Sequence, residues 1–211
     1  MNIHAVVPVK EISAAKQRLA DFLSEARRQA LALAMLEDVL ETLADCPLAS
    51  IVVVTADAGA ARIAGAFGAR VWSEGARDSH TAAVAAAALR LAAEGAGMLT
   101  VPADIPLVRP EDIGALLAAS PCAIAPSADE RGTNAVLAAP ADLLPLRFGE
   151  DSFTPHLAAA RARGLEPKIL RLPRVALDLD RPADVAEFLK IPSPTRTRAL
   201  LEKACLEPSR C

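Results

Sequence analysis

Short apolar runs alternate with longer amphipathic stretches along most of the chain. The runs predict four buried strands of a parallel sheet, at residues 4–9, 51–54, 69–72 and 98–101. The stretches between and after them carry apolar residues at helical spacing, and they predict helices that begin near Ser24, Ala58, Thr81 and Pro110. Ser24 is the expected N-cap of the first helix. This alternation is typical of an α/β fold with a mostly parallel sheet.

The pattern changes after residue 120. Two apolar runs, at residues 122–126 and 135–138, are joined by a polar loop, which predicts an antiparallel insertion in the sheet. A helix, two short strands and a last helix follow, at residues 152–163, 168–172, 174–177 and 182–189. We expect a single domain over residues 1–190 and a C-terminal tail over residues 191–211. For this tail we weigh an arm that binds a partner against a surface helix or a loosely held end.

Composition narrows the class of protein. Of 211 residues, 53% are hydrophobic and only 3% aromatic, so the core must be built from Ala, Val and Leu. The net charge of −3 gives no reason to expect nucleic acid as a partner. No apolar run approaches the length of a membrane span and no signal peptide opens the chain, so we expect a cytoplasmic protein with no membrane partner. Four scattered cysteines are expected to be reduced thiols: Cys46, Cys122, Cys205 and Cys211.

Acidic residues follow two of the predicted strands. Asp104 comes directly after the apolar run at residues 97–103, and Asp178 and Asp180 follow the run at residues 174–177. Open α/β sheets hold their ligands beyond the carboxyl ends of the strands. Taken singly, each position is better explained by a turn or a helix cap. Together, the three carboxylates predict a magnesium site for a phosphorylated substrate, because Mg²⁺ prefers a few carboxylates and phosphate oxygens.

A basic loop follows the first predicted strand, with Lys10, Lys16 and Arg18 within nine residues. Lys supplies point charge to phosphate groups, and Arg can bind their oxygens through two N–H groups. Such a loop alone is more often a solvated surface. It gains weight because the first and fourth strands are expected to be neighbours, which would place Asp104 beside it. The chain has no glycine-rich phosphate loop, so side chains must supply most of the contacts.

A second polar cluster lies at residues 131–134 and 148–156. Gly149 can bring a backbone amide close to a ligand. Ser152 stands at a predicted helix start, where free N–H groups favour an anion; without its neighbours, an ordinary N-cap would be the default explanation. Thr133 adds a hydroxyl group. His156 is expected to be a structural histidine rather than a general base.

The polar segments occur in a fixed order, at residues 8–19, 101–107, 132–134, 148–156 and 178–184. The residues of these segments, in this order, resemble those of the CofC/FbiD family of phospho-acid guanylyltransferases. Enzymes of this family act in the biosynthesis of deazaflavin coenzyme F(420). The resemblance covers about residues 1–190. It implies a Rossmann-like fold of the nucleotidyltransferase, glycosyltransferase-A type. It also implies that GTP is joined to phosphoenolpyruvate, 2-phospholactate or 3-phosphoglycerate, with release of pyrophosphate.

The resemblance assigns roles to individual residues. It implies that Mg²⁺ is held by Asp104, Asp178 and Asp180. It implies that the phospho-acid is held by Thr133, Gly149 and Ser152. In our interpretation the leaving pyrophosphate is stabilised by Lys10, Lys16 and Arg18. A homodimer is a common enough arrangement to be expected as well.

One segment departs from the family pattern. Members of the family carry Gly-Leu-Asn at the start of the helix after the third strand, whereas residues 79–81 here are Ser-His-Thr. Recognition of guanine is therefore implied by the family and not by these residues. Two alternatives stay open: a nucleotidyltransferase of the molybdopterin or sugar-phosphate type, and a non-catalytic nucleotide-binding protein. The absent glycine-rich loop argues against the first. The sequence also leaves open which phospho-acid is preferred.

Overall fold

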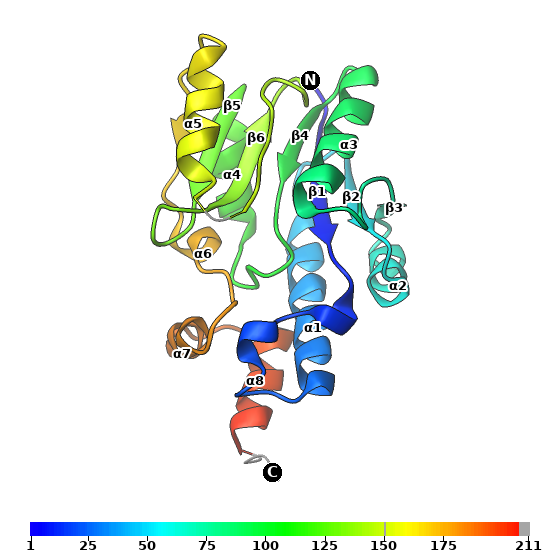
Figure 1. Cartoon of the computed structure of the whole chain (residues 1–211), viewed down its shortest axis with the longest axis vertical. Helices are drawn as coiled ribbons and strands as arrows, with labels where there is room; N and C mark the ends of the chain where they lie inside the picture. Colours follow the sequence, from blue (N-terminus) through cyan, green and yellow to red (C-terminus); the bar gives the residue numbers. More distant parts are fainter. Residues whose placement is uncertain (150, 207–211) are drawn as a thin grey trace.

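The computed structural model describes residues 1–149 and 151–206. A seven-stranded sheet in the order β3-β2-β1-β4-β6-β5-β7 carries helices on both faces (Figure 1). The strands are β1 (Ile3–Val9), β2 (Ser50–Thr55), β3 (Arg70–Trp72), β4 (Gly97–Thr100), β5 (Cys122–Pro126), β6 (Thr133–Ala138) and β7 (Lys168–Ile169). The helices include α1 (Glu25–Ala44), α2 (Ala58–Ala66), α3 (His80–Ala93), α4 (Pro110–Ala118), α5 (Phe153–Ala162), α6 (Pro173–Ala176), α7 (Pro182–Lys190) and α8 (Arg196–Leu206). This architecture confirms the predicted fold class.

The sheet has a parallel half and a mixed half. β1 is parallel to both β2 and β4, and β2 is parallel to β3. Beyond β4, β6 runs antiparallel to both of its neighbours, and β7 is parallel to β5. Two predictions are thereby confirmed: the first and fourth strands are neighbours, and residues 122–138 form an antiparallel insertion. The loops that follow β1 and β4 therefore leave the sheet side by side at the same edge.

Alternate side chains of the central strands enter two separate core layers. Val53 of β2 packs in the layer that contains α1, α2 and α4, whereas Val52 and Val54 pack in the layer that contains α3 and α5. The second layer uses small side chains, such as Ala83 and Ala87 of α3, which are nearly fully buried. Because a one-residue slip would move the side chains of a strand from one core layer to the other, packing in both layers fixes the register of β1 and β4.

Of two strands predicted after residue 165, one is absent and the other is shorter than predicted. Residues 174–177 do not form a strand, because Pro173 begins the short helix α6. Proline suits the first helical position, where its missing N–H would have had no partner and its fixed φ already fits the helix. The strand predicted at residues 168–172 ends at Ile169. Asp178 and Asp180 therefore follow a helical turn instead of a strand.

Two predicted helix caps lack a capping hydrogen bond from the side chain. Ser24 and Ser152 both occupy N-cap positions, of α1 and α5, but neither side chain caps its helix. The hydroxyl of Ser152 instead accepts a hydrogen bond from the backbone N–H of Thr133, at 3.0 Å. By contrast, Asp57 and Ser79 do cap α2 and α3 through their side chains. Ser152 is thus available for a different role.

The described part of the C-terminal tail packs on α1 as helix α8 (Figure 1). Leu201 is fully buried, and the buried carboxylate of Asp38 accepts the backbone N–H groups of Arg196 and Thr197, both at 2.9 Å. Residues 207–211 lie outside the described residues.

The predicted thiols are observed where the structure describes them. Cys46 and Cys122 are free. Cys211 lies outside the described residues, as does the side chain of Cys205. Within the described part of the chain, no helix has both the length and the apolar character needed to cross a membrane.

Candidate functional site

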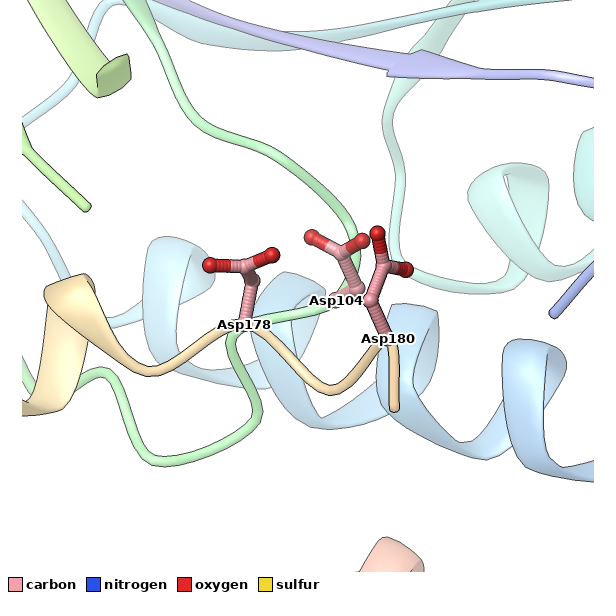
Figure 2. Close-up of side chains that lie close together, drawn as sticks. All are labelled: Asp104, Asp178 and Asp180. Atoms are coloured by element: carbon pink, nitrogen blue, oxygen red, sulfur yellow. The ribbon is translucent and has the colours of Figure 1, made fainter. Parts of the chain in front are cut away.

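Three aspartates meet beyond the ends of β4 and α6. Figure 2 shows the carboxylates of Asp104, Asp178 and Asp180 projecting to the same side of the two segments that carry them. Each offers an oxygen within 4.8 Å of the others. The N–H of Leu179 donates to the carbonyl oxygen of Asp104, at 3.0 Å, and so joins the two segments. Three carboxylates are hard oxygen donors of the kind that Mg²⁺ takes together with phosphate and water oxygens, so the residues present fit this cation.

An asparagine from the antiparallel half of the sheet orients one of these carboxylates. Ala125 of β5 pairs with Ala135 of β6, but Pro126 pairs with Thr133, so that Asn134 is the extra residue of a β-bulge. A bulge re-aims the side chain of its extra residue. The amide nitrogen of Asn134 donates to Asp178 Oδ1, at 3.1 Å, and to the carbonyl oxygen of Val175, at 2.8 Å.

An ion pair that the sequence did not reveal joins α6 to α4. Arg174 of α6, four residues before Asp178, binds Asp112 of α4 through two hydrogen bonds of 2.7 and 2.8 Å. The side chain of Asp112 is 4% exposed, so this pair is shielded from water on one side. The only signal in the sequence is the position of Asp112, three residues after Arg109, the N-cap of α4. The carboxylate of Asp112 also accepts the backbone N–H of Arg109.

Lys16 lies between two of the three aspartates. Its ammonium group is 2.7 Å from Asp104 Oδ2 and 2.6 Å from Asp180 Oδ1, and its side chain is only 9% exposed. Lys16 also has a positive φ of 52°, an uncommon conformation for a residue other than glycine. The ammonium thus neutralises two carboxylates that were predicted to hold a metal ion. Lys16 itself was predicted to stabilise the leaving pyrophosphate.

The charges of this cluster shift its pKa values in opposite directions. Burial favours the uncharged form of Asp104, but the adjacent ammonium of Lys16 outweighs it and lowers the pKa of Asp104. Burial likewise works against the charge on Lys16, yet the two carboxylates raise its pKa. The pKa of Asp178 is raised, first by burial and then by the charge of Asp104. Asp178 thus carries the least compensated charge of the three, which a further cation would relieve.

The other two predicted cations lie near the same cluster. Arg18 is half exposed, and its guanidinium is 3.5 Å from Asp180 Oδ2. Lys10 is exposed and lines the adjoining cavity. The loop that carries all three cations is attached to α2, because the carboxylate of Asp57 accepts the N–H of Ile12 at 3.1 Å while it caps that helix. Asp57 is a second residue that the sequence analysis missed; its position between a strand and a helix was the available signal.

A cavity of about 940 Å³ adjoins the aspartates. It lies between the loop after β1, the segment before α3, the start of the loop after β4, and α1. Lys16, Asp104 and Asp180 form part of its wall, and Lys10 and His80 line it as well. A cavity of this size is in the range of pockets that hold small molecules and cofactors.

The segment that departs from the family pattern is built into the wall of this cavity. Ser79 caps α3, and the hydroxyl of Thr81 bonds to both the N–H and the carbonyl oxygen of Phe148, at 3.0 and 3.2 Å. Thr81 is therefore engaged by the protein itself. His80 faces the cavity, and its ring packs on Phe148 with 4.7 Å between centroids. Burial lowers the pKa of His80 to about 4, so it is neutral near pH 7.

A close turn at Gly75 holds the residues that precede α3 against the first turn of that helix. Gly75 has a φ of +71°, and a Cβ atom there would lie 2.6 Å from the carbonyl oxygen of Ala82. Only glycine allows both the conformation and the approach.

Two of the three residues predicted to hold the phospho-acid lie together. Thr133 and Ser152 are 7% and 4% exposed and are joined by the 3.0 Å hydrogen bond from the N–H of Thr133. The buried ring of His156 lies 3.0 Å from the hydroxyl of Thr133. Gly149 is exposed and has a φ of +135°. Among the hydrogen bonds of the described residues, none joins Gly149 to the hydroxyl of Thr133 or of Ser152. The ligand roles of all three residues stay predictions.

Comparison with known proteins gives a consistent family. Residues 3–209 match the family model described as "Guanylyl transferase CofC like". A phosphoenolpyruvate guanylyltransferase from Rubrobacter xylanophilus is 42% identical over 196 residues, which cover 89% of this chain and 94% of that protein. One from Roseiflexus castenholzii is 38% identical over 200 residues, covering 95% and 94%.

Solved structures of low sequence identity share the fold. A putative nucleotide-diphospho-sugar transferase from Desulfovibrio desulfuricans superimposes with a TM-score of 0.80 at 20% identity, over 98% of this chain and 96% of that one. A 4-diphosphocytidyl-2C-methyl-D-erythritol synthase superimposes with a TM-score of 0.62 at 18% identity, over 95% and 99%. The family match, however, decides against a molybdopterin or sugar-phosphate enzyme and against a non-catalytic protein. The chain belongs to the CofC-like guanylyl transferases, a family of nucleotidyltransferase enzymes.

Proposed function

We propose that this protein transfers the guanylyl group of GTP to phosphoenolpyruvate and releases pyrophosphate. An oxygen of the acceptor phosphate forms a bond to the α-phosphorus of GTP, and the bond from that phosphorus to the oxygen of the leaving pyrophosphate breaks. The observation that carries the proposal is the cluster of Asp104, Asp178, Asp180 and Lys16 at the edge of a cavity of about 940 Å³. Relatives named phosphoenolpyruvate guanylyltransferase support this choice of acid.

The chain's own residues would act through charge and position. The acceptor oxygen is already anionic, so no strong general base is needed. Asp104, Asp178 and Asp180 would hold Mg²⁺, which when bound supplies positive charge to the phosphate oxygens. Lys10, Lys16 and Arg18 would stabilise the pyrophosphate as its charge develops. Thr133, Gly149 and Ser152 would hold the phospho-acid through hydroxyl and amide donors.

The product of this reaction would be a guanylylated phospho-acid. We place it in the biosynthesis of deazaflavin coenzyme F(420) on the basis of the family resemblance, and we expect the reaction to take place in the cytoplasm.

Pyrophosphate release in the presence of Mg²⁺ tests the proposal directly. The purified protein is incubated with each of the four nucleoside triphosphates and each of the three phospho-acids, and the products are identified by mass. We expect release with GTP that depends on phosphoenolpyruvate, together with the guanylylated acid. Release with another nucleotide only, or release that does not need a phospho-acid, would overturn the proposed function.

The basic loop can be tested against a matched arginine in the tail. Arg18→Ala should lower kcat/KM by roughly 10- to 100-fold, because a charged donor near the phosphates is lost. Arg196 lies in an ion-pair cluster on α1 and does not line the cavity; its partners, which do not line it either, are Glu37, Asp38 and Glu41. Arg196→Ala should therefore lower the melting temperature slightly and leave turnover within about twofold. Equal, small effects of both changes on pyrophosphate release would remove the loop from the site.

The acid pocket makes a separate prediction. Ser152→Ala should raise the KM for the phospho-acid about tenfold, the loss expected for one hydrogen bond to a charged group, while the KM for GTP barely changes. Ser50→Ala is a suitable control, because Ser50 stands at the amino end of β2, away from the carboxyl ends of the strands, and its hydroxyl bonds to the ring of His4. Steady-state kinetics with each substrate varied in turn decide the matter. A rise in the GTP constant alone would assign this cluster to the nucleotide.

A further inference from the structure

The hydrogen bonds of His156 determine which of its ring nitrogens carries the proton. The ring is 1% exposed, and its Nε2 accepts the backbone N–H of Arg147 at 2.9 Å. A nitrogen that accepts a hydrogen bond cannot carry a hydrogen, so in the neutral ring the proton is on Nδ1. Burial lowers the pKa of His156 to about 4, and the ring is therefore neutral near pH 7.

The protonated nitrogen faces Thr133. Nδ1 lies 3.0 Å from the hydroxyl oxygen of Thr133, so Nδ1–H donates and the hydroxyl accepts. The hydroxyl hydrogen of Thr133 cannot point at His156 and must be directed elsewhere. Ser152 is in the same situation, because its hydroxyl oxygen accepts the N–H of Thr133. Neither hydroxyl hydrogen has an acceptor among residues 1–149 and 151–206.

Two buried hydroxyl groups thus have no hydrogen-bond acceptor among the described residues. Buried polar groups normally find a partner, and a missing acceptor for two adjacent donors points to a ligand that accepts hydrogen bonds. An anion with several oxygens, such as a phosphate or a carboxylate, meets that need. Thr133 is directly followed by Asn134, whose side chain donates to Asp178, one of the candidate metal ligands.

We propose that His156 is a positioning residue for the phospho-acid: by donating from Nδ1 it keeps the hydroxyl hydrogen of Thr133 available to the acid. This inference rests on the proposed function, in which Thr133 contacts the acid. His156 touches no substrate in this proposal and transfers no proton. It acts by fixing the direction of a neighbour's hydrogen bond.

A merely structural role is the competing explanation, because the His156 ring also packs edge-on against Phe148, with 5.1 Å between centroids. Two substitutions separate the roles. In His156→Gln, the side-chain amide reaches the position of Nε2 and can still accept the N–H of Arg147, but the donor to Thr133 is lost. In His156→Asn, the amide reaches the position of Nδ1 and can still donate to Thr133, but the acceptor for Arg147 is lost.

The experiment measures both Michaelis constants for wild type, the two variants, Thr133→Val and the double variant His156→Gln/Thr133→Val. We expect His156→Gln to raise the KM for phosphoenolpyruvate about tenfold and to leave the KM for GTP within about twofold. His156→Asn should retain the acid constant within about threefold, even if its melting temperature falls. In the Thr133→Val background, His156→Gln should add nothing, because the hydroxyl that it orients is already absent.

Three outcomes would overturn the inference. The two His156 variants could raise both constants alike, which is the signature of a structural role. The effects of His156→Gln and Thr133→Val on the acid constant could multiply, which would show that His156 does not act through Thr133. A wild-type protein inactive with every phospho-acid would overturn the proposed function and this inference with it, whereas an active wild type with multiplying effects overturns the inference alone.

Discussion

Asp104→Asn is expected to abolish turnover while the protein stays folded. Asp104 belongs to the cluster of three carboxylates and also binds the ammonium of Lys16. Removing one carboxylate from a site that joins a metal ion to phosphate groups should cost several kcal/mol of transition-state stabilisation, roughly a thousandfold or more in kcat/KM. The fold should survive, because the side chain is 28% exposed and the substitution also relieves repulsion from Asp178.

Asp142→Asn provides the matched control, because Asp142 is exposed and does not line the cavity. Pyrophosphate release and a thermal melt are measured on both variants. Near-normal activity of Asp104→Asn would contradict the metal assignment of this residue. Loss of folding would instead show that Asp104 serves mainly to shape the loop after β4.

The parts of the fold that could be predicted are those fixed by local patterns. β1 and β2 are continuous apolar runs, and such runs have few alternatives to a strand buried on both faces. The antiparallel insertion was readable because two runs follow each other without room for a crossover helix. The run at residues 174–177 misled, since four residues cannot show whether apolar positions recur at strand or helix spacing, and Pro173 decided for a helix.

The parts of the site that could not be predicted depend on contacts between distant segments. Lys16 reaches Asp104 across 88 positions and Asp180 across 164. No local sequence pattern distinguishes a lysine that binds carboxylates of the protein from one that binds the phosphates of a ligand. Asn134 points at Asp178 only because a bulge in β6 turns it there. The role of Ser152 was likewise hidden, because a serine at a helix start predicts a cap, whereas a partner 19 positions away engages its hydroxyl.

The position of Lys16 suggests that it competes with a metal ion in the free protein. Its ammonium contacts Asp104 and Asp180, two of the three candidate ligands. A metal ion that binds these carboxylates would take over their neutralisation and release the ammonium toward the adjoining cavity. There the phosphates of a nucleotide would offer it new partners, since Lys acts as a point charge toward phosphate oxygens.

Lys16→Met is therefore expected to change turnover and metal binding in opposite directions. Turnover should fall about 100-fold, the usual effect of removing a charged donor from a phosphate-transfer site. The free protein should bind Mn²⁺, used as a probe for Mg²⁺, several-fold more tightly, because no ammonium competes for the carboxylates. Pyrophosphate release and electron paramagnetic resonance of the free protein titrated with Mn²⁺ measure the two effects.

The measurement needs a pH at which Asp104 stays ionised and a control lysine outside the site. Lys16 holds the pKa of Asp104 below its ordinary value, so the substitution raises that pKa, and measurements at pH 8 keep the carboxylate ionised in both proteins. Lys190→Met removes a largely exposed ammonium that pairs with Glu187, and it should change neither quantity. If Lys16→Met weakens Mn²⁺ binding together with turnover, Lys16 orients the carboxylates for the metal ion instead of competing with it.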